Sequence, residues 1–413
     1  MMGHKKHIGI GFAAGRINFL SVLQAYIYHL KETRFLEKSD SCISLFVAFD
    51  PGYNNTRRED YDNLSEEEKG FFHTCMFIGP EDVQAEKEFL VKQQIMDQEC
   101  AEKCFGNGYA VQRNIILYEA LKQKVDYLIF LDDDEYPLAV TDSMTSSLWS
   151  GQSVLEEHVR GLQFSDVTNG YHCGYLTPIP FIEFDGVLGE THFRMFTDAL
   201  SSDVLKWESV QRMIRNGGVK YADKKILMEH KTKLVRQEKG AKFISGGNLG
   251  INLTCPEKVL PFYNPPGARG EDSILSTCLE NHTVKKIPVY TFHDGFSFYR
   301  SLLKGVLPIT LKRISLYDSV HVSHRFYKAC IGWIRYKPLY TYITQRQDYE
   351  DIMQEAKEYL DTALPSVCDY FNNRDFYKIR QELDTYEGLV KEHYDEFQMS
   401  LVSWSDLIKK TIL

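Results

Sequence analysis

The sequence lacks several features that would place it in other classes of protein. It has no run of the roughly 18 apolar residues that a membrane-spanning helix needs, so we expect no transmembrane segment. It has no excess of positive charge, and a net charge of -9 excludes general nucleic-acid binding because a polyanion would be repelled. It has no internal repeat at a fixed period.

We also expect neither a disulfide framework nor an export signal. The nine cysteines are odd in number and irregularly spaced, and no second ligand pair echoes Cys100 and Cys104. We therefore interpret them as thiols in a reducing compartment. The short apolar run near the N-terminus is broken by a glycine and an arginine before it reaches the length of a signal-peptide core. We expect a cytoplasmic protein.

What is present is an alternation of apolar strand patterns and helical patterns. Alternation of this kind predicts an α/β fold with a mainly parallel sheet between helices, and ligands then bind beyond the carboxyl ends of the strands. The predicted strands are His7–Phe12, Ile43–Asp50, Asp126–Leu131 and Ile287–Phe292, and the predicted helices are Arg16–Glu32 and 111–124.

The pattern changes along the chain in a way that suggests two parts. Residues 1–298 carry the strand signals, and residues 299–413 are helical in pattern, which predicts a C-terminal helical region. The segment Leu138–Met228 is irregular and rich in aromatic residues, glycine and proline. We treat its His172, Glu190 and His192 as ordinary residues.

Three adjacent aspartates, Asp132, Asp133 and Asp134, follow the third predicted strand. Adjacent carboxylates repel one another unless a positive charge neutralises them, and Mg²⁺ or Mn²⁺ does so while also bridging to phosphate oxygens. The alternative is a solvated acidic turn. The place of the cluster at the end of a buried strand favours a metal site.

This segment resembles the signature of nucleotide-sugar glycosyltransferases with the GT-A (Rossmann-like) fold, in which an apolar strand ends in Asp-x-Asp. The context is similar to the family-two, inverting members, over roughly residues 7–298. The resemblance implies that Asp134 binds the metal and that Asp132 contacts the metal and the donor. It also implies that Asp133 lies against the nucleotide-sugar.

Two further segments carry the resemblance. Gly108, Arg113 and Asn114 match the family's glycine-rich loop and the helix after it, on the donor side, where a helix N-terminus suits phosphate. Glu271 and Asp272 match the family's acid pair, whose Asp is the general base. Glycosyl transfer needs such a group because the acceptor hydroxyl must lose its proton, although acids in a first helical turn also act as caps.

The remaining candidate residues are placed by the same resemblance. His293 follows the last predicted strand and is expected to complete the metal shell, since imidazole suits Mn²⁺, although a lone histidine is often structural. Asp50 is expected near the base or ribose, and Arg16 near the diphosphate. The chain lacks the family's usual Pro-Thr-Tyr-Asn opening. Small residues of the expected sugar pocket, which could instead form a tight turn, are Gly246, Gly247 and Asn248.

These observations predict a metal-dependent glycosyltransferase of hexosyltransferase type, with a nucleotide-sugar donor and a carbohydrate or lipid-linked acceptor. One alternative is a sugar-phosphate nucleotidyltransferase, although no Pro-Lys follows the segment GIGFAAGR. The other is a non-catalytic carbohydrate-binding protein on the same fold.

The segment 300–340 mixes basic and aromatic residues, a composition that suits an anionic membrane surface. Peripheral contact with the inner face of the membrane is therefore one interpretation. The other is a helix packed on the catalytic domain, with its basic face paired with the acidic stretch from Asp348 onward.

Overall fold

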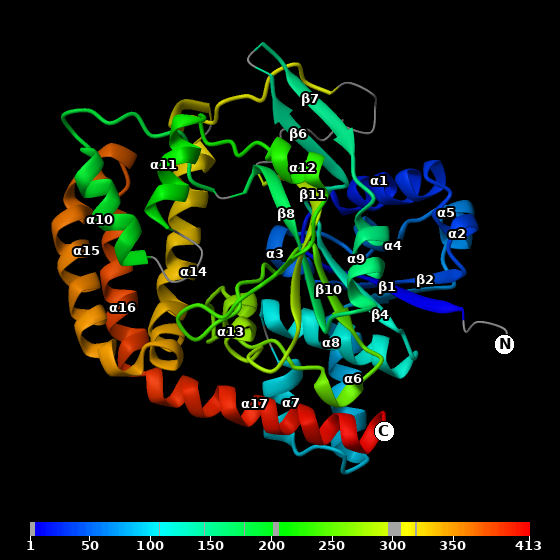
Figure 1. Ribbon diagram of the computed structural model, residues 1–413. Helices are drawn as coiled ribbons and strands as arrows, with labels where there is room; N and C mark the ends of the chain where they lie inside the picture. Colours follow the sequence, from blue (N-terminus) through cyan, green and yellow to red (C-terminus); the bar gives the residue numbers. More distant parts are fainter. Residues whose placement is uncertain are drawn as a thin grey trace.

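The computed structural model describes residues 5–106, 108–143, 145–176, 178–200, 206–295, 307–318 and 320–413. It shows a large sheet of mostly parallel strands flanked by helices, with a bundle of long helices beside it (Figure 1). This mixed α/β architecture agrees with the fold class that the alternating patterns predict.

The sheet has nine strands, and its order places the early strands at one edge. The order is β3-β2-β1-β4-β10-β8-β11-β5, and β9 pairs with β11. The first four are parallel, β10 is antiparallel to both β4 and β8, and β8 is parallel to β11. Six strands therefore point the same way. The bounds are β1 Lys6–Ala14, β2 Ser41–Phe49, β3 Thr74–Ile78, β4 Tyr127–Asp132, β5 Glu135–Tyr136, β8 Val167–Tyr175, β9 Lys233–Leu234, β10 Leu249–Asn252 and β11 Val284–Asp294. A separate hairpin joins β6 Leu138–Asp142 to β7 Ser147–Gly151.

Helices cover both faces of the sheet, and each face has its own apolar core. Helix α1 (Phe19–Glu32) and α9 (Val154–Leu162) pack on one face, and α7 (Gln98–Phe105) and α8 (Tyr109–Lys122) on the other. Glycines in β1 let α8 approach closely, because a Cβ at Gly11 would lie 2.9 Å from Ile116. The other helices of this part of the chain are α2 Phe35–Lys38, α3 Pro51–Asn54, α4 Glu59–Asp62, α5 Glu66–Gly70, α6 Pro80–Lys92, α12 Lys224–Glu229 and α13 Glu271–Thr277.

The C-terminal region is helical, as its pattern predicts. It contains α14 (Val320–Thr344), α15 (Tyr349–Phe371), α16 (Lys378–Gly388) and α17 (Val390–Thr411). The apolar core of this bundle does not begin at residue 299. It includes side chains of two helices from the irregular middle of the chain, α10 (Glu190–Leu200) and α11 (Trp207–Arg215), which stand beside α14 and α15 in Figure 1.

The described part of the segment 300–340 packs into the protein. Its aromatic side chains Phe326, Trp333 and Tyr336 belong to the core of the bundle, and Arg335 forms an ion pair with Glu382 at 2.7 Å. The structure therefore supports the packed-helix interpretation, and it gives no support to membrane contact through this segment. Arg300 and Lys304 lie outside the described residues. Among the helices described, none is long and apolar enough to cross a membrane.

Candidate metal centre and surrounding site

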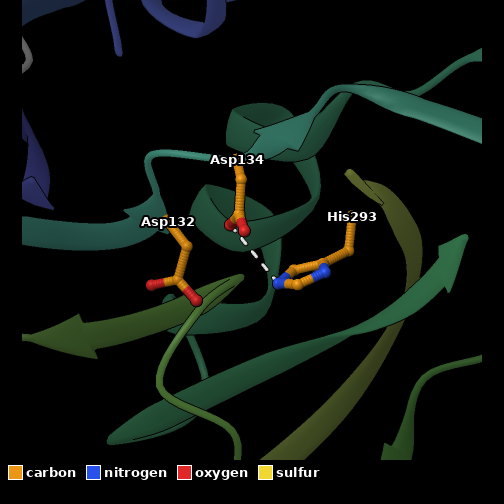
Figure 2. Close-up of side chains that lie close together, drawn as sticks. All are labelled: Asp132, Asp134 and His293. Atoms are coloured by element: carbon orange, nitrogen blue, oxygen red, sulfur yellow. Dashed lines mark ion pairs between the residues drawn. The ribbon is translucent and has the colours of Figure 1, made fainter. Parts of the chain in front are cut away.

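Two of the three adjacent aspartates meet His293 at the carboxyl end of β4. Asp132 ends the strand, Asp134 lies in the turn after it, and His293 lies on β11. One ligand atom from each lies within 4.8 Å of the other two, and the side chains converge in Figure 2. Asp134 Oδ1 is 3.3 Å from His293 Nε2. The predicted metal ligands are therefore brought together.

Strand pairing holds His293 in this position. The short β5 turns back against β11, so that His293 lies opposite Glu135, and the Asp294 amide donates to the Asp134 carbonyl at 2.8 Å. His293 lies within β11, which is longer than the predicted strand. Its Nδ1 donates to the Tyr175 carbonyl at 2.6 Å, which leaves the Nε2 lone pair facing the aspartates.

The electrostatics of the three groups suit a cation. Burial lowers the pKa of His293, although Glu135 opposes this effect, so its imidazole is neutral and able to ligate. Burial alone would raise the pKa of Asp132, but the neighbouring Arg113 and His293 outweigh it and lower the pKa. Two carboxylates and one imidazole form a ligand set that fits Mn²⁺ or Mg²⁺, with coordination positions to spare.

The buried Asp134 Oδ2 accepts no hydrogen bond of normal geometry, although Arg16 Nη1 lies against it as an ion pair. Asp133, in contrast, faces the loop after β1. Its Oδ2 accepts from the amides of Gly15 and Arg16, each at 2.8 Å. Asp133 therefore anchors the loop that carries Arg16, while Asp134 lies between Arg16 and His293.

Asp50 lies at the same edge of the sheet, because the end of β2 adjoins the end of β1. Its amide donates to the Ala14 carbonyl at 3.0 Å, and its exposed side chain caps α3 through the Gly52 amide at 2.9 Å. The predicted nucleotide-facing residues Arg16 and Asp50 are thus neighbours beside the aspartates.

Arg113 connects four of the segments that the sequence singles out. From α8 its guanidinium reaches Asp132 at 3.0 Å, Glu271 at 3.3 Å and the Gly246 carbonyl at 2.8 Å. The side chain is only 6% exposed and stacks over Phe130. A buried guanidinium is stable here because carboxylates from β4 and α13 neutralise it.

Asp272 lies beside this cluster in the first turn of α13. Its Oδ2 accepts from the Gly246 amide at 2.7 Å, and its Oδ1 accepts from the Ser273 amide at 2.8 Å. The acid pair therefore divides its contacts, since Glu271 holds Arg113 while Asp272 lies against the glycine segment. Gly270 precedes the helix with φ +88°, and Tyr336 of α14 packs where its Cβ would be.

The structure adds a buried polar network that the sequence reasoning missed. Glu135 Oε1 lies 2.6 Å from His172 Nδ1, and His172 Nε2 lies 2.8 Å from Ser245 Oγ. Burial and the charge of Asp132 raise the pKa of Glu135 to about 8. Glu135 could have been suspected because it continues the acidic run, but nothing local in the sequence marks His172. His172 lies between Glu135 and Ser245, so it is part of this buried network and not the ordinary residue that the sequence suggests.

Two predicted site residues have other surroundings than expected. Asn114 is buried, and its amide binds the backbone of Cys104 and Phe262. Asn248 is also fully buried, with its amide held by His158 and Tyr171. These partners correct the expected ligand roles, and both side chains support the backbone around the site.

The three predicted glycines differ in how close they lie to the site. Gly108 precedes α8 with φ +120°, and a Cβ there would approach only the Asn264 side chain. Nothing in the described part of the chain joins Gly108 to the carboxylates. Gly246 and Gly247 are at the site, where the backbone approaches Arg113 and Asp132 too closely for a side chain.

No model of a known protein family matches the chain, and the search among curated proteins found no match either.

Proposed function

We propose that the protein is a metal-dependent glycosyltransferase with a GT-A-like site, which moves a sugar from a nucleotide-diphosphate sugar to an acceptor hydroxyl. The observation that carries the proposal is the link through Arg113. It joins the aspartate that ends β4 to the acid pair of α13 within one buried cluster. The proposed metal ligands and the proposed general base therefore belong to neighbouring segments, an arrangement that would suit transfer from a nucleotide-sugar.

Asp132, Asp134 and His293 would hold the cation, which supplies charge neutralisation for the leaving nucleoside diphosphate. Arg16 lies at the same edge and would face the diphosphate. Asp272 accepts the proton of the acceptor hydroxyl as that oxygen attacks the anomeric carbon. Attack from the side opposite the leaving group inverts the configuration at that carbon.

Arg113 and Gly246 position these groups. The guanidinium fixes Asp132 and Glu271, and the Gly246 amide fixes one oxygen of Asp272. The other oxygen accepts from the adjacent Ser273 amide. Fixed orientation of this kind lowers the entropic cost of bringing base and donor together.

The proposal is tested by replacing Asp134, one of the predicted metal ligands. Asp134→Ala should abolish metal-dependent donor binding and the release of nucleoside diphosphate, because it removes a carboxylate that no neighbour replaces. A screen of nucleotide-sugars for nucleoside diphosphate release, with Mn²⁺ or with a chelator, measures this. Asp406→Ala on the exposed face of α17 is the matched control.

Full turnover in excess chelator would refute the proposal. Release of pyrophosphate from a nucleoside triphosphate and a sugar phosphate would instead identify a nucleotidyltransferase. Donor binding without any release under all conditions would favour the non-catalytic carbohydrate-binding alternative.

A further inference from the structure

A small cavity lies between helix α1 and the first turn of helix α9. Its lining includes Tyr26 and His29 of α1, together with Ser153, Leu155 and Glu156 at the start of α9. Its volume is about 10 Å³, which is room for one particle of roughly the size of a water molecule. None of these residues takes part in the proposed glycosyl transfer.

Two polar atoms of the lining are buried and lack a protein partner. Tyr26 is 1% exposed, and neither its hydroxyl nor His29 Nε2 has a hydrogen-bond partner among the described residues. Burial raises the pKa of Tyr26 well above its usual value, and the charges of Glu135 and Asp132 add to this effect. The hydroxyl therefore keeps its proton and can donate. Because a buried polar atom without a partner is costly, two of them in the lining of one cavity point to a bound particle.

The first turn of α9 adds backbone donors to the same cavity. Ser153 is the N-cap residue, and its side chain accepts no hydrogen bond from the helix. In the part of the chain that the structure describes, the amides of Leu155 and Glu156 reach no acceptor, as is usual for amides at the start of a helix. An amide can only donate, and the partial positive charge of a helix N-terminus favours an anion.

The acidic side chains of this turn are neutralised by an arginine. Arg160 pairs with Glu156 at 3.0 Å and with Glu157 at 2.7 Å. The Glu156 side chain is also 52% exposed, so solvent screens its charge. Burial lowers the pKa of His29, although Glu32 opposes this effect, so the imidazole is neutral and donates from Nε2 when its proton lies there.

The groups open to an occupant are therefore a hydroxyl, a ring nitrogen and two amides. This set of donors suits an anion better than a water molecule, whose own two protons need acceptors. The volume suits a single atom and is too small for a phosphate or carboxylate group.

We propose that this cavity binds one halide ion, with chloride as the natural occupant, between the Tyr26 hydroxyl and the first turn of α9. The ion links α1, which packs against β5, to the helix that follows the β6–β7 hairpin. The inference does not rest on the proposed glycosyltransferase function.

The first test is the thermal unfolding of the full chain in increasing sodium chloride, with sodium gluconate keeping the ionic strength constant. Gluconate is too large for the cavity, so we expect chloride to raise the midpoint in a saturable way, because it binds the folded state. Tyr26→Phe keeps the ring and removes the hydroxyl, and it should weaken chloride binding about tenfold or more, since a charge-assisted hydrogen bond is lost. Tyr28→Phe is the matched control, because that side chain is 64% exposed on the same helix. A rise without saturation, or an equal rise in Tyr26→Phe, would overturn the halide site.

The second test locates the ion in crystals of the protein grown in sodium bromide. We expect an anomalous bromide peak at hydrogen-bond distance from the Tyr26 hydroxyl. A peak there without anomalous signal would overturn the halide and identify a buried water molecule instead. Both tests are made in chelator and without a nucleotide-sugar, so their failure leaves the proposed function standing. Failure of metal-dependent nucleotide release likewise leaves the halide site standing.

Discussion

Arg113 is a buried arginine whose charge is balanced by neighbouring carboxylates. Its place in the sequence, just after a glycine-rich loop, predicts a residue on the donor side of the site. In the structure, burial opposes its charge, but Asp132, Glu271 and Asp272 outweigh this and raise its pKa. Its partners come from segments about 20 and about 160 residues away in the chain, so only the folded structure shows their number.

The assignment of the base to Asp272 can be tested directly. Asp272→Asn should lower turnover by about 100-fold or more, because the amide cannot accept the hydroxyl proton. Donor affinity should change little, since the residue acts on the acceptor. Steady-state turnover and donor binding, measured on the same protein, separate the two effects.

Glu271→Gln provides the comparison for that experiment. Glu271 holds Arg113 and has no backbone bond to the glycine segment, so its loss should disturb the donor side more than the proton transfer. Near-normal turnover in Asp272→Asn together with lost turnover in Glu271→Gln would show that the two roles are reversed.

At the residue scale, the sequence predicts the location of the titratable site residues better than the role of the asparagines. Asp132, Asp134 and His293 could be predicted because each lies at or near a strand end, and parallel strands end at one edge of a sheet. Asn114 and Asn248 could not be separated from ligand-binding residues. An asparagine that binds backbone 148 residues away has no local signal that distinguishes it from one that binds a sugar.

Among the elements, the segment before β10 shows why small residues are required at the site. A Cβ at Gly247 would lie 2.7 Å from Asp132 Oδ2 and 2.7 Å from both carboxylate oxygens of Glu135. A carbon at this distance must displace one of the carboxylates. The close approach fits the predicted role of the glycines, and it makes that role testable without knowing the substrate.

Gly247→Ala should weaken Mn²⁺ binding by about tenfold or more, because an alanine methyl pushes Asp132 away from its position in the ligand set. Titration of Mn²⁺ followed by electron paramagnetic resonance measures the free ion. Gly186→Ala is the control, since a Cβ there meets no atom within 4 Å. Unchanged Mn²⁺ affinity in Gly247→Ala would show that Asp132 is not a ligand.

The elements that could be predicted are those with continuous apolar runs. Strands β1, β2, β4 and β11 were predicted within a few residues of their ends. Strand β10 is four residues long and contains glycine, and β8 carries polar residues such as Asn169 and His172. Both are placed by pairing with strands far along the chain, and a local pattern carries no record of that pairing.

On the scale of the whole molecule, the sequence indicates two parts but not how they share their cores. Helices α10 and α11 leave the irregular middle of the chain and pack into the C-terminal bundle. Helix α17 returns from the bundle to the sheet, where Trp404 joins the core formed by α7 and α8, and it runs along that side of the molecule in Figure 1. A boundary at 298 divides the sequence patterns, whereas the apolar contacts cross it in both directions.

Because the apolar cores include residues from both sides of position 298, we expect a single cooperative unfolding transition. Trp404 is 1% exposed, and its indole donates to the Val259 carbonyl at 2.9 Å. Trp404→Ala should lower the free energy of unfolding by about 3 to 5 kcal/mol, the usual cost of removing a large buried aromatic side chain. Because α17 joins the bundle to the sheet, the whole transition should move to lower denaturant concentration. Far-ultraviolet circular dichroism and tryptophan fluorescence should then give the same midpoint.

Val402→Ala is the control, since that side chain is 63% exposed on the same helix. Two separate midpoints, only one of which shifts in Trp404→Ala, would mean that residues 1–298 and 299–413 fold as independent domains despite their shared cores.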